Sequence, residues 1–223
     1  MHETSDLQMG KEWPGDCRAV RSPLLAVATA LAVVIALTVG ATPAAAGAAT
    51  DSVRDTINEV IRILENQELK KPERADERRR LLEKVIGARF NYEEMAKRTL
   101  GAHWAKLSDA ERREFVGLFT SLLTNTYADK ITGYSGEQVH YLNERLEGEY
   151  AEVRTKVVSG KAEIPLDYRL LNQSRDWRVY DVIVDGVSLV NNYRGQFMKI
   201  LRSSSYADLI EQLRKKSEKI KSP

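Results

Sequence analysis

The chain has 223 residues, with 34 Lys and Arg against 32 Asp and Glu, and its one cysteine is Cys17. A net charge of +2, without a basic stripe interleaved with aromatic residues, gives no nucleic-acid signature, so we exclude a nucleic-acid partner. Because no cysteine follows residue 17, the rest of the chain has no disulfide, no thiolate metal site and no cysteine nucleophile.

The N-terminus has the order of a secretory signal. Arg18 and Arg21 precede an uncharged apolar run, and the small residues of TPAAAGAA follow it. That segment offers A-x-A cleavage choices ending at Ala46 and at Ala48, so we expect residues 1–48 to be a signal peptide that is removed on the general secretory route. The alternative is an uncleaved N-terminal anchor, because the apolar run approaches the length of a membrane span.

Residues 49–223 are long enough for one domain with a packed core, and we expect a single domain there. The first 48 residues hold three basic and four acidic side chains, which leaves 31 basic against 28 acidic ones, a net charge of +3. This mild excess is compatible with contact to anionic headgroups.

Apolar residues at helical spacing predict helices in the first part of this domain. The first spans about residues 51–66, the second opens at Pro72, and a short third one opens at Asn91. Ser108 and Glu111 have the spacing of a capping box, and a wide apolar stripe follows them as far as Ile131. Two more helices are expected near the C-terminus, at about residues 189–202 and 206–220.

From Gln138 to Val187 the period of the pattern changes to two, with turn residues between four runs. The second and third runs carry apolar residues on one face and polar residues on the other, which is typical of an antiparallel sheet with helices on one side. In the fourth run the alternation does not settle which face is inward. Its apolar residues are Trp177, Val179 and Ile183 on one face, and Tyr180, Val182 and Val184 on the other. We therefore predict an α+β fold, with a four-stranded antiparallel sheet covered on one face by about six helices.

The sequence shows no catalytic or metal-binding constellation. After residue 48 the only histidines are His103 and His140, far apart and without a carboxylate or cysteine at metal-ligand spacing. We therefore expect no enzyme, no metal and no cofactor. A small α+β enzyme that works through a single aspartate stays open, with Asp167, Asp181 or Asp185 as its candidate.

Four blocks of sequence carry a family resemblance. They are NYEEMAKRTLGAHW from Asn91, TYADKITGYSG from Thr126, IPLDYRL from Ile164 and WRVYDVIVDGVSLVNNYRGQFMKIL from Trp177. The last block is the most specific, because a strand leading through Asp-Gly into SLVNNYR is a long run. In order and spacing these blocks resemble the MlaC / toluene-tolerance family over essentially the whole chain after residue 48.

The resemblance implies a non-enzymatic, monomeric lipid carrier of the Gram-negative periplasm, with residues 49–223 as its lipid-binding domain. Phospholipid would be the cargo, with its acyl chains in an apolar cavity between the sheet and the helices. The partners implied are an outer-membrane lipoprotein complex and an inner-membrane ABC transporter with a substrate-facing domain, and the process is the maintenance of outer-membrane lipid asymmetry. A hopanoid or other polycyclic lipid is an alternative cargo.

For the cavity wall we expect apolar residues of the sheet face, of the helix that follows Ser108 and of the helix that begins at Leu189. They are Leu118, Leu122, Tyr127, Val153, Val157, Ile164, Leu166, Tyr168, Val182, Val184, Val187, Leu189, Tyr193 and Phe197. From periodicity alone, the same residues could form a closed core in a ligand-free interaction protein. Arg194 and Lys199 are candidates to meet a headgroup phosphate, or else lie in solvent.

Overall fold

A computed structural model describes residues 47–219 of the chain. The expected signal peptide, residues 1–48, lies almost entirely outside this range. Within it, no helix is both long and apolar enough to cross a membrane.

The described residues form six α-helices, two short 3-10 helices and five strands. The helices are α1 (Ala48–Glu65), η2 (Pro72–Arg74), α2 (Ala75–Arg89), α3 (Tyr92–Leu100), η3 (Gly101–Lys106), α4 (Asp109–Thr132), α5 (Leu189–Ser203) and α6 (Tyr206–Lys219). The strands are β1 (Gln138–Glu147), β2 (Tyr150–Ser159), β3 (Ala162–Gln173), β4 (Asp176–Val184) and β5 (Val187–Ser188). Ser108 caps α4 in a capping box with Glu111, which confirms the start predicted for this helix.

The sheet is an antiparallel meander in which the strands lie in the order β1-β2-β3-β4-β5. The α+β class is confirmed, but the strand count was wrong by one. The additional strand, β5, has two residues and pairs with Ile183 and Val184 just before it. A strand this short shows no periodicity in sequence, so the pattern could not reveal it.

A bulge at Tyr180 explains the ambiguous alternation of the fourth strand. Arg169 pairs with Asp181, and Leu170 pairs with Val179, so Tyr180 is an extra residue on β4. In a regular strand every second residue faces the core, and a bulge of this kind exchanges the two alternating sets of residues from that point on. Trp177 and Val179 before the bulge, and Val182 after it, therefore reach the same buried cluster.

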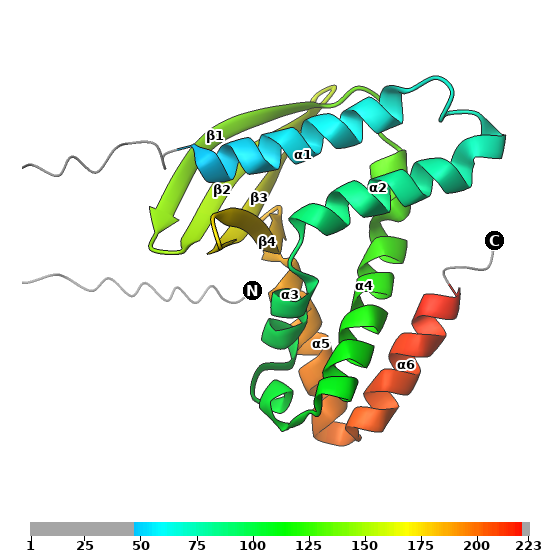
Figure 1. Ribbon diagram of the computed structural model, residues 1–223, viewed down its shortest axis with the longest axis vertical. Helices are drawn as coiled ribbons and strands as arrows, with labels where there is room; N and C mark the ends of the chain where they lie inside the picture. The colour runs from blue at the N-terminus through cyan, green and yellow to red at the C-terminus, as the bar shows by residue number, and fades with distance from the viewer. Residues whose placement is uncertain (1–46, 220–223) are drawn as a thin grey trace, which may run out of the picture. The chain divides into compact units, whose positions relative to one another are not determined.

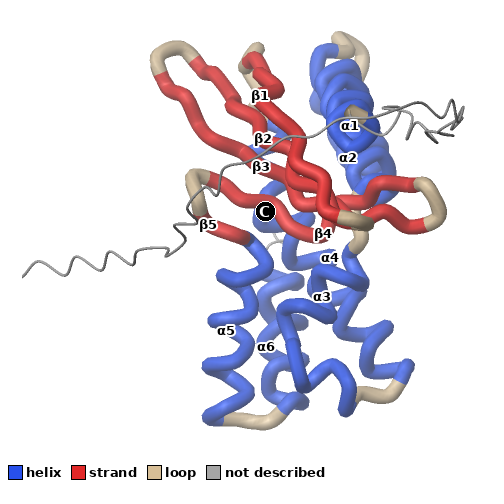
Figure 2. The backbone as a smooth tube through the Cα atoms, turned by 90° about the vertical axis from the view of Figure 1, so that its left-hand side faces the viewer, coloured by secondary structure: helices blue, strands red, loops and turns tan. Residues whose placement is uncertain are grey.

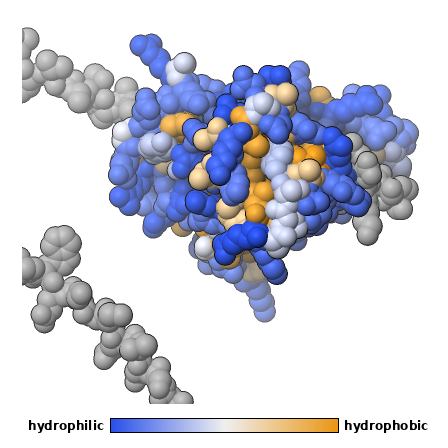
Figure 3. Space-filling view, turned by 90° about the horizontal axis from the view of Figure 1, so that it is seen from below, coloured by the Kyte–Doolittle hydropathy of each residue, from blue (hydrophilic) through white to orange (hydrophobic). Residues whose placement is uncertain are grey.

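The helices form two groups around the sheet (Figures 1 and 2). In the first, α1 packs on the sheet, and α2 runs back beside α1. In the second, α3 to α6 form a bundle that extends beyond β4 and β5. Six helices were expected, but only part of this set lies directly on the sheet. The surface seen from below is mostly hydrophilic, with a run of hydrophobic side chains between hydrophilic ones (Figure 3).

Aromatic side chains close the core of the bundle. Phe115 and Phe119 of α4 meet Phe197 of α5 edge to face, with ring centroids 5.7 and 5.9 Å from that of Phe197. Tyr193 adds a further edge-to-face contact with Phe119 at 5.5 Å. Such pairs contribute beyond the area they bury, so the junction of α4 and α5 is a well-packed, closed region.

Glu144 of β1 holds the N-terminus of α1 against the sheet. Its carboxylate accepts hydrogen bonds from the backbone N–H groups of Gly47 at 2.9 Å and Thr50 at 2.7 Å, and from the Thr50 hydroxyl at 2.6 Å. The first N–H groups of a helix have no partner within the helix, and a carboxylate there also favours the helix dipole. This contact joins residues 94 or more positions apart and fixes where α1 crosses the sheet.

Asp181 holds the start of α5 to β4. Its buried carboxylate accepts hydrogen bonds from the Ser188 hydroxyl at 2.6 Å and from the Val190 N–H at 3.0 Å. Arg169 of the neighbouring strand lies 3.5 Å from the same carboxylate. Because Ser188 itself caps α5 through the N–H of Asn191, one carboxylate orients the whole β4–β5–α5 corner.

We expect Asp181→Ala to lower the free energy of unfolding by about 2–4 kcal/mol, since it leaves buried donors and a guanidinium without their acceptor. Urea denaturation measures this change. Asp129→Ala is the control, because Asp129 is an exposed residue of α4, and we expect it to change stability by less than about 0.5 kcal/mol. Equal effects of the two substitutions would contradict the role of Asp181.

Candidate functional site

A cavity of about 710 Å³ lies between the sheet and the helices α2, α3, α4 and α5. Its volume is within the range of roughly 300–1,000 Å³ that small-molecule sites occupy, and it is about five times the ~150 Å³ that holds one benzene ring. The cavity therefore has room for long alkyl chains.

The sheet side of the wall is apolar. It is formed by Val157 of β2, by Ile164, Leu166 and Tyr168 of β3, by Val182 and Val184 of β4, and by Val187 of β5. The helix side adds further apolar and aromatic residues, which are Leu82, Ile86, Phe90, Tyr92, Met95, Leu123, Tyr127, Ala128, Ile131 and Leu189.

Much of this wall is accessible to solvent. Ile164 is 42% exposed and Val187 is 55% exposed, and both lie on the cavity wall. Val157, Leu166 and Val184 are half-buried. A closed core would bury side chains of this kind, so the exposure indicates a hollow that opens to the surface and can receive an apolar ligand.

Polar groups on the wall are few and come mainly from α2 and α4. Arg79 forms an ion pair with Glu83 at 2.9 Å and donates a hydrogen bond to Asn125 at 2.6 Å. Lys130, Thr124 and Thr132 of α4 and Asn192 of α5 complete the set.

Two wall tyrosines are held in their neutral form. Burial and the neighbouring Tyr193 hydroxyl raise the pKa of Tyr127 to about 12. Burial also raises the pKa of Tyr168 above its ordinary value. Neither phenol is activated as a base at neutral pH, and an apolar wall with neutral phenols suits the binding of an uncharged hydrocarbon better than acid–base chemistry.

Nine of the fourteen residues that we predicted for the wall lie on it. They are Tyr127, Val157, Ile164, Leu166, Tyr168, Val182, Val184, Val187 and Leu189. Their role in binding stays a prediction, because position alone does not identify a ligand.

The other five residues were wrongly assigned to the wall. Leu122, Tyr193 and Phe197 are buried in the core of the helical bundle, and Leu118 packs against that core. Val153 is fully buried beneath α1. Their apolar spacing matches that of the wall residues, but other side chains fill the space in front of them.

The prediction also missed the contribution of α2. Leu82 and Ile86 line the cavity, although no residue of this helix was among those predicted for the wall. Phe90, Tyr92 and Met95 were missed too, and the apolar spacing of these five residues was the available signal. Arg194 and Lys199 are exposed and do not line the cavity, and the Arg194 guanidinium lies against Gly101 instead.

None of the three candidate aspartates lines the cavity. Asp181 accepts hydrogen bonds from Ser188 and Val190 at the start of α5. Asp167 accepts one from the Thr155 N–H at 3.3 Å. Asp185 lies in the turn before β5 with a φ of 49°. Within residues 47–219, no group of three or more His, Cys, Asp or Glu side chains could hold a metal ion.

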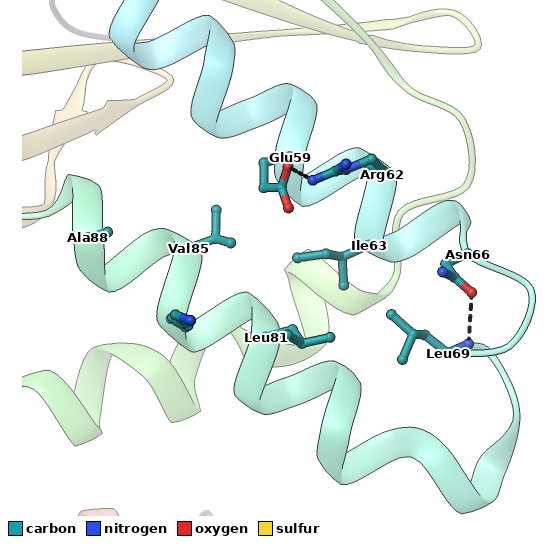
Figure 4. A pocket seen from close by; sticks show the side chains of 9 residues that line it. Glu59, Arg62, Ile63, Asn66, Leu69, Leu81, Val85 and Ala88 are labelled. Carbon is teal, nitrogen blue, oxygen red and sulfur yellow. Dashed lines mark hydrogen bonds and ion pairs between the residues drawn. The ribbon is translucent and has the colours of Figure 1, made fainter.

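A second hollow, of about 540 Å³, lies between α1 and α2 (Figure 4). Ile63, Leu69, Leu81 and Val85 provide its apolar lining, and an ion pair between Glu59 and Arg62 lies at its edge. It is smaller than the cavity under the sheet and is lined by only nine residues. The cavity under the sheet is therefore the stronger candidate site.

Comparisons with known proteins agree with this geometry. A family model described as MlaC protein matches residues 54–215. The intermembrane phospholipid transport system binding protein MlaC of Haemophilus influenzae is 25% identical over 129 residues, which make up 55% of this chain and 60% of that protein. The aligned part of the chain thus spans less than two thirds of that relative's length.

A solved structure has the same fold. It is that of a phospholipid-binding protein from Ralstonia solanacearum in complex with a phospholipid, and it matches with a TM-score of 0.69 and 22% sequence identity. The match covers 77% of this chain and 98% of the other. At this identity the likeness concerns the fold.

We expect truncation of a core side chain to lower the free energy of unfolding more than truncation of a wall side chain. Leu122→Ala removes a side chain from the closed bundle core and should lower the free energy of unfolding by about 2–5 kcal/mol. Leu166→Ala removes a half-buried wall side chain of the same size and should cost about 1 kcal/mol. Urea denaturation of the two variants measures the difference, and equal losses would mean that the cavity is closed in solution.

Proposed function

This chain belongs to the MlaC family, and on that premise we propose that it is a periplasmic carrier that holds the acyl chains of a phospholipid in the cavity under its sheet. The observation that carries the proposal is the continuous apolar wall, which is large and reachable from solvent. The family match and the phospholipid named for both relatives support the choice of ligand.

The energetics of lipid transfer favour a deep site of this kind. A two-chain lipid exposes ~30 methylene groups in water, which at ~0.8 kcal/mol each is a cost of roughly 24 kcal/mol. A carrier must remove most of that apolar surface from water. The four strands and four helices that surround the cavity allow contact along much of both chains.

In this proposal the carrier moves lipid between an outer-membrane lipoprotein complex and an inner-membrane ABC transporter, and so maintains outer-membrane lipid asymmetry. The name of the Haemophilus relative, an intermembrane transport system binding protein, supports the assignment to such a pathway. The cargo is bound and released unchanged, so no cofactor, metal or catalytic group takes part.

The deciding experiment is mass spectrometry of the intact protein prepared from the periplasm, together with its organic extract. We expect a cleaved N-terminus close to residue 48 and about one phospholipid per chain. A polycyclic lipid in the extract would mean that the cargo is this lipid and not a phospholipid. A protein that carries no lipid after gentle preparation would contradict the proposal.

A substitution on the wall tests where the lipid lies. We expect Leu166→Arg to lower phospholipid occupancy about ten-fold, because an unpaired guanidinium would have to be buried beside the acyl chains. Occupancy is read from the lipid-to-protein ratio of the extract, and circular dichroism checks the fold.

Leu142→Arg is the matched control for this test. Leu142 is a leucine of the same sheet, but it is 60% exposed and does not line the cavity. Occupancy should stay at the level of the unaltered protein. A loss as large as that of Leu166→Arg would place the lipid elsewhere.

A further inference from the structure

The charges on the cavity wall are unevenly placed. The sheet side carries no charged residue, and the helix side carries Arg79, Glu83 and Lys130. Arg79 and Glu83 form an ion pair, and Arg79 also donates to Asn125, so these two charges offset each other. Lys130 forms no ion pair with any residue of the described range, which leaves it as the one uncompensated charge on the wall.

Lys130 is one of several polar residues that α4 and α5 contribute to the cavity wall. Tyr127 and Lys130 are three residues apart on α4 and therefore share a face of that helix. The Tyr127 hydroxyl neighbours that of Tyr193 on α5, and Asn192, the residue before Tyr193, is exposed and lines the same cavity. The cavity thus has a polar rim at α4 and α5, whereas Ile164 and Val187 form an apolar rim at the sheet.

We propose that Lys130 binds the phosphate of the lipid at this polar rim, so that the carrier holds its cargo in one orientation, with the acyl chains along the sheet. The inference rests on the proposed function of the same cavity. An ammonium group on a flexible stem binds a phosphate as a point charge and leaves the remainder of the headgroup in solvent. The carrier then distinguishes a phosphate-bearing lipid from a neutral one but accepts different phospholipid headgroups.

A competing explanation for Lys130 is its place in the last turn of α4, where a cation interacts favourably with the helix dipole. That role would affect the stability of the helix and leave lipid selection unchanged. The test therefore needs a readout of selection as well as one of stability.

The experiment uses the exported chain after its lipid has been removed. It is incubated with vesicles that contain equal amounts of phosphatidylglycerol and dioleoylglycerol, and the lipids retained after re-isolation are counted by mass spectrometry. We expect the unaltered protein to favour the phospholipid. Lys130→Gln should lower the ratio of phospholipid to diacylglycerol about five-fold, as expected for loss of one charge pair at the exposed Lys130 side chain. Lys130→Glu should lower it further, and Lys130→Arg should preserve it.

Lys106→Gln is the control, because Lys106 is an exposed lysine of η3 that does not line the cavity, and the ratio should not change. A Lys130→Gln protein that keeps the ratio of the unaltered protein overturns the inference, whether or not its stability falls, and leaves the carrier function standing. If the unaltered protein takes up neither lipid, the proposed function fails, and the inference fails with it.

Discussion

The apolar face of the sheet is the constraint on which the rest of the structure depends. Such a face must be covered by protein or by another apolar partner, because water is a poor partner for it. Here the face is divided. Near the β1–β2 and β3–β4 turns, side chains such as Val153 and Leu170 are fully buried with α1, whereas Val157 and Leu166, four residues away on the same strands and the same face, line the cavity. One continuous apolar surface is thus core at one end and cavity wall at the other.

The sequence was sufficient to predict which face of β2 and β3 is apolar, because the period of a strand is fixed by its geometry. It was not sufficient to predict which part of the face is closed. That depends on where α1 lies, and α1 is positioned by contacts such as that of Glu144 with Thr50, which no local pattern reveals. The same limit explains the residues of α4 and α5 that were wrongly assigned to the wall. An apolar helix stripe is equally compatible with a cavity and with the aromatic packing that Phe119 and Phe197 provide.

The fourth strand shows a second limit of periodicity. The extra residue at Tyr180 shifts the parity of every position after it, so Val179 and Val182 face the same side although a regular strand would separate them. The alternation in the sequence was ambiguous because the strand itself changes parity. This shift brings Val182 and Val184 onto the wall, and it also places the Asp181 carboxylate where it can hold the start of α5.

The bulge and the Asp181 contacts together hold one side of the cavity wall in place. A sealed void of 710 Å³ would cost roughly 17 kcal/mol at ~24 cal/mol per Å³, more than the whole stability of a typical domain. The half-exposed wall residues point to a different solution, in which the hollow opens to water and the cost is that of wet apolar surface. The exposed apolar surface still favours collapse of the cavity, which would move the helices that face the sheet toward it. Asp181 opposes this collapse at the β4–β5–α5 corner, because closing that side of the cavity would separate a buried carboxylate from Ser188 and Val190. On the other side of the cavity, Arg178 of β4 donates hydrogen bonds to the backbone carbonyls of Gly87, Ala88 and Phe90, and Phe90 itself lies on the wall. Collapse of the cavity is therefore opposed by hydrogen bonds to the sheet both at the end of α2 and at the start of α5.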